Sequence, residues 1–160
     1  MDEPSWLEKT RGYIDLGMFK EALNEIERLP QKLRADPEVQ EMRIIIELDR
    51  EDFNQALALS EVLVELHPEN HAGFIQGAYC LHAMQRTEDA IEHLQSGPVT
   101  LQEESVYFYN LACYEVALGK NQAAYSWLQH AIEMEPAARR RALEDQELGP
   151  LHHLIKKPKI

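Results

Sequence analysis

A spacing of 34 residues constrains this chain more than any other feature of its sequence. Ala22, Ala56, Ala90 and Ala124 are each separated from the next by 34 residues. They lie in similar octapeptides, which read FKEALNEI, FNQALALS, TEDAIEHL and NQAAYSWL. A fixed period of this length is typical of repeat proteins, in which each unit is one supersecondary element stacked on its neighbours.

Each 34-residue unit predicts two amphipathic helices joined by a tight turn. We expect the alanines to mark the point where the two antiparallel helices cross, because a methyl group allows two backbones to approach closely. Five residues before the alanines, where the first helix must end, stand Gly17, Glu51, Gln85 and Gly119. Glycine suits this place because it adopts a left-handed conformation at little cost. Prolines end the second helix in two units, at Pro68 and Pro136.

These units resemble the tetratricopeptide repeat family. The fourth unit carries the most signature positions: Phe108, Leu111, Ala112, Ala124, Leu128, Ala131 and Pro136. The third unit matches at Phe74, Ala78, Leu81, Ala90 and Leu94, and the first at Trp6, Tyr13, Ala22 and Ile26. The second matches in its second helix, at Phe53, Ala56, Leu63 and Pro68, but has polar Gln40, Arg43 and Glu47 in its first.

The resemblance implies an all-α fold, a right-handed superhelical array of antiparallel helix pairs. The repeats would span about residues 3–36, 37–70, 71–104 and 105–136 of a single domain covering residues 1–160. Pro30 and Pro98 come early, so we expect the second helices of the first and third units to be about a turn shorter. Residues 137–160 supply apolar positions on both sides of Gly149 and Pro150, which predicts a capping helix and a shorter helical segment.

The charge of the chain bears on its partners. Its net charge is −12, and an acidic body repels nucleic acid and anionic lipid. Basic residues at the C-terminus (Arg139 to Arg141, Lys156, Lys157 and Lys159) leave a nucleic-acid-binding tail as a remote alternative. No apolar run approaches the ~20 residues of a membrane span, and the acidic N-terminus is unlike a secretory signal. We therefore expect a cytoplasmic protein that does not contact membranes.

No spacing of residues predicts a reaction or a metal site. His67 and His71 are separated by Pro68, while Cys80 and Cys113 stand alone in apolar patterns. The sequence also lacks the nucleophile, phosphate-binding and dinucleotide-binding motifs of common enzymes. We expect no catalytic residue, no metal, no cofactor and no small-molecule substrate.

The resemblance also implies a concave groove lined by the first helix of each unit. Its predicted partner-binding residues are Met42, Ile45, Leu48, Ile75, Gln76, Tyr79, Tyr109, Asn110 and Cys113. Tyrosines are frequent binding hot spots, and side-chain amides can hydrogen-bond an extended peptide. Some family members hold acidic C-terminal tails in a clamp of basic residues and asparagines. Arg11 and Asn110 alone remain of such a clamp here, and Glu8 and Glu41 would repel an acidic tail.

The sequence thus predicts a non-enzymatic protein-interaction module, a scaffold or adaptor that binds a peptide or helical segment of a partner. Two alternatives stay open. One is a chaperone like those of bacterial secretion systems, which shield hydrophobic segments of exported proteins. The other is a homo-oligomeric scaffold, such as a homodimer, whose groove is filled by its own subunit. The apolar strip could also be core, because residues 42–48 (MRIIIEL) are apolar almost all round.

Overall fold

The computed structural model describes residues 5–155, which form helices and turns without a strand in that range. The chain divides into two compact units, Met1–Cys80 and Leu81–Ile160. No helix among the described residues is long and apolar enough to cross a membrane. The predicted all-α fold of antiparallel helix pairs is confirmed, and the single domain over residues 1–160 stays a prediction. Predictions that rest on residues 3 and 4 or on Lys156, Lys157 and Lys159 lie outside the described residues.

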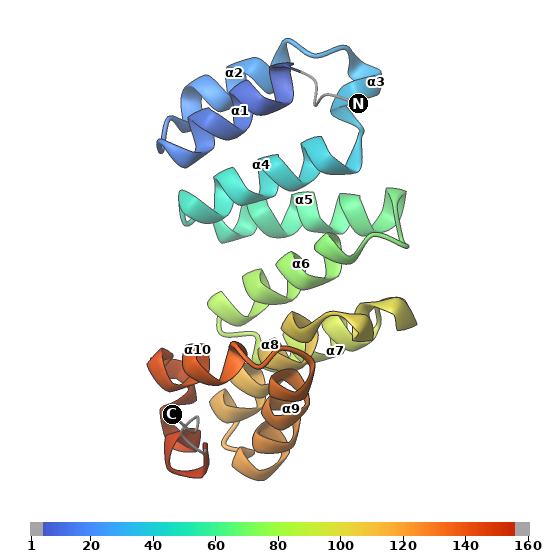
Figure 1. Cartoon of the computed structure of the whole chain (residues 1–160). Helices are drawn as coiled ribbons and strands as arrows, with labels where there is room; N and C mark the ends of the chain where they lie inside the picture. The colour runs from blue at the N-terminus through green and yellow to red at the C-terminus, as the bar shows by residue number, and fades with distance from the viewer. Residues whose placement is uncertain (1–4, 156–160) are drawn as a thin grey trace. The chain divides into compact units, whose positions relative to one another are not determined.

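The first unit is built from two helix pairs and the beginning of a third. Its elements are α1 (Ser5–Asp15), α2 (Phe19–Glu27), α3 (Gln31–Arg34), α4 (Pro37–Asp49), α5 (Phe53–Leu66) and most of α6 (His71–Ala83). Figure 1 shows α1 beside α2 and α4 beside α5, each pair antiparallel. The second unit contains α7 (Thr87–Gln95), the 3-10 helix η1 (Val99–Glu103), α8 (Ser105–Ala117), α9 (Asn121–Met134), α10 (Ala138–Glu144) and the 3-10 helix η2 (Gln146–Leu154).

The turn inside each helix pair has the same backbone geometry. Gly17, Glu51, Gln85 and Gly119 have φ angles of 70°, 58°, 63° and 77°. In the last turn, the Gly119 N–H donates to Val116 O at 2.9 Å and the Lys120 N–H donates to Glu115 O at 2.9 Å. The other three turns repeat this pair of hydrogen bonds, which defines a Schellman motif. The repeat therefore imposes a left-handed residue at this position, even where the residue is not glycine.

The repeated alanines belong to the core, which agrees with the close helix contacts predicted for them. Ala22, Ala56, Ala90 and Ala124 are all fully buried. Four residues after each alanine the chain has another buried residue. It is Ser60 in the second 34-residue repeat, and Ile26, Leu94 and Leu128 in the other three repeats. The Ser60 hydroxyl donates to Ala56 O at 2.8 Å, which satisfies this polar group inside the core.

The early prolines shorten two helices, also as predicted. Helices α2 and α7 have 9 residues each, whereas α5 and α9 have 14. Pro30 and Pro98 then precede α3 and η1, the short helical turns that connect to the next pair. Only the second connection is anchored in the core: Leu101 of η1 is 1% exposed, whereas α3 has no buried residue.

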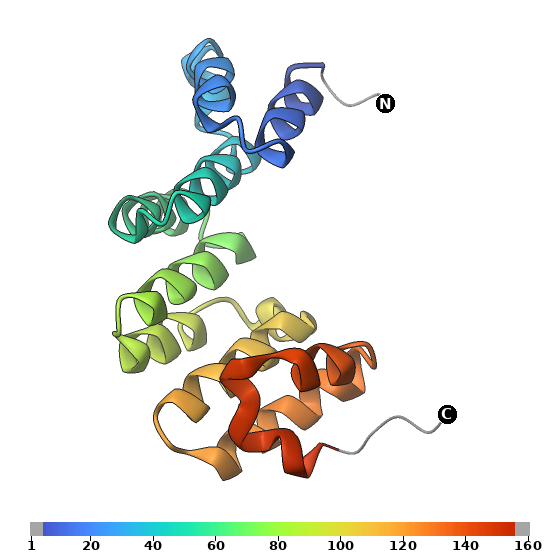
Figure 2. The same ribbon diagram turned by 90° about the vertical axis from the view of Figure 1, so that its left-hand side faces the viewer.

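Helix α10 and η2 form the predicted C-terminal cap, which lies against α8 and α9 (Figure 2). Ala138, Ala142, Leu148 and Leu151 of the cap are fully buried. The break between its two parts was predicted at Gly149 and Pro150, and this position is wrong. Helix α10 ends at Glu144, and the next residue, Asp145, accepts a hydrogen bond on its carboxylate from the Glu147 N–H at 3.0 Å and so caps the start of η2. The 3-10 helix then runs through Pro150.

Candidate partner-binding surface

Five of the predicted groove residues, on α4 and α6 of the first unit, are accessible and mostly apolar. Ile45 and Tyr79 are 37% and 47% exposed, and the remaining three are partly exposed. Ile45 and Leu48 are three residues apart on α4, and Ile75 and Tyr79 are four apart on α6, so each pair shares a helix face. We refer to these residues as the α4–α6 strip: Ile45, Leu48, Ile75, Gln76 and Tyr79.

Hydrogen bonds hold the beginning of α6 against α4. The Asn70 side chain donates from Nδ2 to Glu41 Oε1 at 3.1 Å, and its Oδ1 accepts a hydrogen bond from the Ala72 N–H at 2.9 Å. One side chain therefore caps α6 and ties it to the preceding first helix. Glu41, which was expected to repel an acidic partner, already has a partner within the chain.

Close packing fixes α6 against α5 as well. A Cβ added to Gly73 would lie 2.8 Å from Val64 Cγ2 and 3.3 Å from Ser60 O, so no larger residue fits there without movement of α5. Near the other end of α6, the rings of Tyr79 and Phe53 lie 6.5 Å apart between centroids and are tilted by 59°. These contacts give the α4–α6 strip a rigid base, although the signature positions of the second repeat are partly polar.

Met42, also predicted for the groove, belongs instead to the hydrophobic core. It is 4% exposed and packs in one cluster with Leu7, Ala22 and Ile26 of the first helix pair. Its neighbours Ile44 and Ile46 are fully buried, whereas Ile45 faces outward. Helix α4 is buried on more than one side, which explains why residues 42–48 are apolar almost all round.

Two of the three predicted groove residues of α8 are much less accessible than Ile45 and Tyr79, whereas Asn110 is partly exposed like the rest of the α4–α6 strip. Tyr109 and Cys113 are 7% and 6% exposed, and Asn110 is partly buried. The Tyr109 hydroxyl donates to Asp145 Oδ2 at 2.7 Å, and the Arg141 guanidinium lies 4.9 Å from the centre of the tyrosine ring. Burial and the neighbouring Asp145 carboxylate raise the pKa of Tyr109. The cap therefore covers the face of α8 that the family resemblance assigned to a partner.

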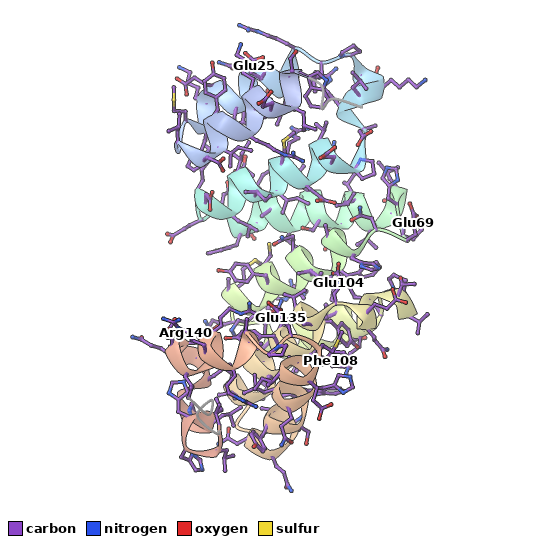
Figure 3. All side chains as sticks on the ribbon, in the orientation of Figure 1. Glu25, Glu69, Glu104, Phe108, Glu135 and Arg140 are labelled. Atoms are coloured by element: carbon purple, nitrogen blue, oxygen red, sulfur yellow. The ribbon has the colours of Figure 1, made fainter. Side chains whose placement is uncertain are left out.

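Arg11, the one basic clamp residue, forms an exposed ion pair with Glu38. The ring contacts of Phe108 in the second unit lie within the pair of helices α8 and α9. Phe108, labelled in Figure 3, stacks on His130 with a centroid distance of 4.0 Å. This arrangement stabilises the contact between α8 and α9 and leaves no aromatic platform for a ligand at Phe108.

A group of potential metal ligands comes together in the second unit, although the sequence spacing gave no sign of it. Ligand atoms of Cys113, Asp145 and Glu147 all lie within 4.8 Å of one another. They come from α8 and from the beginning of η2, which are distant in the sequence. No ligand spacing within one segment could have revealed this group, because the fold of the cap creates it.

Comparison with known proteins identifies the fold. No family model matches the sequence, and no curated protein does either. The solved structure of MamA from Desulfovibrio magneticus RS-1, starting at its residue 41, is 15% identical, with a TM-score of 0.71, and the match covers 96% of this chain and 87% of that one. The structure of PilF from Pseudomonas aeruginosa is 13% identical, with a TM-score of 0.73, and the match covers 97% of this chain and 77% of that one. Both are tetratricopeptide repeat proteins, so the prediction of a tetratricopeptide-like fold is confirmed.

Proposed function

We propose that the protein is a non-enzymatic interaction module that holds a helical segment of a partner protein against the α4–α6 strip. One observation carries the proposal. Ile45, Tyr79 and Cys113 occupy the same position in three successive 34-residue units. The chain's own cap covers Cys113, whereas Ile45 and Tyr79 are exposed.

The cap indicates what kind of segment suits this face. It consists of α10 and η2, two short helical pieces that bury small and branched apolar side chains. It also accepts one hydrogen bond from this face, from the Tyr109 hydroxyl to Asp145. A partner with the same pattern would cover Ile45 and the ring of Tyr79, while Gln76 could hydrogen-bond to its backbone. Full burial of an exposed apolar side chain contributes about 1.5–3 kcal/mol, and covering the 37% of Ile45 and 47% of Tyr79 that are exposed would contribute a corresponding fraction of it.

The strip is suited to a protein partner. Large apolar side chains on a rigid helical surface give affinity without charge, and tyrosine is common at binding hot spots. The acidic composition of the chain disfavours nucleic acid.

The cysteines Cys80 and Cys113 are both unpaired, which fits a reducing compartment such as the cytoplasm.

The test compares Ile45→Ala and Tyr79→Ala with two control variants in pull-downs from the native host. Leu16→Ala and Val99→Ala are the controls, because Leu16 and Val99 are even more exposed (74% and 78%) but lie outside the strip. We expect each strip variant to weaken capture of a specific protein by ~1–3 kcal/mol, the usual loss for an anchor residue, and the controls to leave it unchanged. Capture should also survive moderate salt, since the contact is mainly apolar.

The purified variants are also measured by sedimentation without a partner. If the strip variants change the mass of the protein, the face is a contact between copies of this chain, and the proposal of a separate partner is wrong. If neither capture nor mass differs from the controls, the strip is not a binding surface.

A further inference from the structure

Three side chains with metal-binding atoms come together where the cap meets α8, and a fourth, His82, lies beside one of them. Cys113 lies on α8, Asp145 and Glu147 stand at the beginning of η2, and His82 lies near the end of α6, in the part of that helix that belongs to the second unit. The Cys113 Sγ and one oxygen from each carboxylate lie within 4.8 Å of one another. His82 Nε2 lies 2.9 Å from Glu147 Oε1.

The Cys113 thiol has an unusual environment. It is 94% buried, at 6% exposure, and it forms no hydrogen bond with another side chain among residues 5–155. Burial and then the negative charges of Asp145 and Glu147 raise its pKa. A buried, weakly polar sulfur gives two neighbouring carboxylates little electrostatic stabilisation. A cation shared by the sulfur and both carboxylates would stabilise all three groups.

The Asp145 carboxylate is held in place by hydrogen bonds from the cap and from α8. Asp145 Oδ1 accepts the Glu147 N–H at 3.0 Å, and Oδ2 accepts the Tyr109 hydroxyl at 2.7 Å. Behind them, His152 Nε2 lies 2.8 Å from Ala142 O and 2.9 Å from Asp145 O. Such outer contacts orient the ligands of protein metal sites.

His82 is oriented in the same manner. Its Nδ1 lies 3.0 Å from Thr87 Oγ1, and its Nε2 faces the carboxylate of Glu147. The ring of Tyr114 packs against it with a centroid distance of 4.8 Å. An imidazole that hydrogen-bonds through one nitrogen and points the other at acidic groups has the usual geometry of a metal-ligating histidine.

We propose that His82, Cys113, Asp145 and Glu147 form a zinc site that fastens the cap to α8. Thiolate, imidazole and carboxylate are the ligands of zinc in proteins, and four of them suit its tetrahedral coordination. The thiol and imidazole disfavour magnesium and calcium, which take oxygen ligands. Zinc–ligand bonds of ~2.0–2.3 Å need all four atoms to approach further. Side-chain rotations of the exposed Glu147 and of His82, which now lies beside Glu147, would have to bring their ligand atoms toward Cys113 and Asp145.

Zinc binding replaces the proton of the Cys113 thiol with a zinc–sulfur bond, and the proton passes to solvent. Three negative ligands and one neutral imidazole then surround a dipositive ion. The affinity consequently falls as the pH decreases, because protons compete for the sulfur and for the imidazole. The site would add an ion-dependent contribution to the stability of the cap, independent of any partner on the α4–α6 strip.

The experiment uses the full chain, stripped of metal with a chelator and titrated with Co²⁺ as a spectroscopic probe. We expect one equivalent of Co²⁺ to produce a thiolate-to-cobalt charge-transfer band in the near ultraviolet, and Zn²⁺ to abolish it by displacement. Cys113→Ala should remove the band. Cys80→Ala, the matched variant of the other buried cysteine, should keep it.

Two further variants test the ligands without removing the thiol. Glu147→Gln changes a side chain that is 58% exposed, so the fold should persist, and His82→Asn removes the imidazole. We expect each to weaken zinc binding by at least ~10-fold and to lower the rise in melting temperature that zinc produces in the parent protein.

Three results would overturn the zinc site. The first is the absence of a thiolate band in the parent protein at submillimolar Co²⁺. The second is a band that persists in Cys113→Ala. The third is a zinc affinity that is the same in the parent, Glu147→Gln and His82→Asn, which would place the ion at other histidines of the surface. If Cys113→Ala does not fold, the Glu147→Gln and His82→Asn measurements decide.

Discussion

The Tyr109 hydroxyl donates a 2.7 Å hydrogen bond to Asp145 Oδ2, and this bond joins the first helix of the fourth repeat to the residue that starts η2. A residue predicted to bind a partner therefore binds the chain's own cap. The equivalent face of α4 and α6 carries exposed Ile45 and Tyr79. The distinction between a partner surface and an internal contact in this protein depends on where the cap lies.

Removal of the Tyr109 hydroxyl should loosen the cap. We expect Tyr109→Phe to lower the free energy of unfolding by ~1–3 kcal/mol, because a hydrogen bond to a carboxylate in a buried setting is lost. Tyr125→Phe is the control, since the Tyr125 hydroxyl donates to Leu154 O at 3.0 Å at an exposed position and should cost less. Urea denaturation of both variants measures the difference. Equal losses of unfolding free energy in the two variants would mean that the Tyr109–Asp145 hydrogen bond stabilises the protein no more than the exposed bond of Tyr125.

Replacing glycine by alanine should have opposite effects on stability at Gly12 and Gly119, although both positions have room for a Cβ atom. A Cβ would meet nothing within 4 Å at Gly12 or at Gly119, but Gly119 has a φ of 77°. We expect Gly12→Ala to stabilise the protein by ~0.5–1 kcal/mol, because Gly12 lies inside α1. Gly119→Ala should destabilise it by about 1–2 kcal/mol. Thermal melts of the two variants check the signs, and a shift in the same direction for both would contradict the Schellman turn.

Overpacking should be costly at the helix crossings. Ala124 is fully buried, and we expect Ala124→Leu to destabilise the protein by ~1–3 kcal/mol; Ala90→Leu should behave alike. Ala117→Leu is the control, because Ala117 is exposed at the end of α8. Chemical denaturation gives the three values. A variant at Ala124 that is as stable as the control would show that the crossing lies elsewhere.

The buried thiols should resist modification until the chain unfolds. Burial raises the pKa of Cys80 from 9.0 to about 11, and the pKa of Cys113 is raised too. At pH 8 both are neutral thiols in the folded protein, so we expect their reaction with a disulfide reagent to be at least ~10-fold slower than in denaturant. Rapid reaction of either residue in the metal-free folded protein would contradict the burial.

The same pKa difference predicts how stability depends on pH. A thiol that ionises less readily when folded stabilises the protein fully below pH 9, and this contribution is lost as the pH rises toward about 11. Cys80→Ala should therefore reduce the fall in melting temperature across this interval. An unchanged fall would show that other groups account for it.

Local features of the repeat were predictable from sequence. The alanines, the left-handed turn residues and the early prolines each act within one helix pair, and their spacing alone revealed them. Gln85 and Glu51 occupy the turn although they are not glycines, because the neighbouring helices hold the backbone there. The register of the repeat was thus a better guide than the residue type.

Features that arise between distant segments were not predictable. Met42 and Ile45 are both apolar residues of α4, and the packing of the first helix pair decides that Met42 is buried and Ile45 is not. Cys113 and Tyr79 occupy equivalent positions in the 34-residue repeat. Cys113 belongs to the last repeat, however, where the cap takes the place of a following repeat. The ligand group of Cys113 and Asp145 results from that same end effect.

The cap also determines how an array of this kind can gain or lose length. An additional 34-residue block inserted between α5 and α6 would leave Tyr109 and Asp145 in the same relation, since both lie downstream of the insertion. A block appended after Pro136 would separate them, and the new final helix pair would need side chains that fit α10 and η2. Gain or loss of a whole repeat before α8 would therefore leave this contact intact, whereas the segment from α8 to η2, residues 105–154, has to stay together.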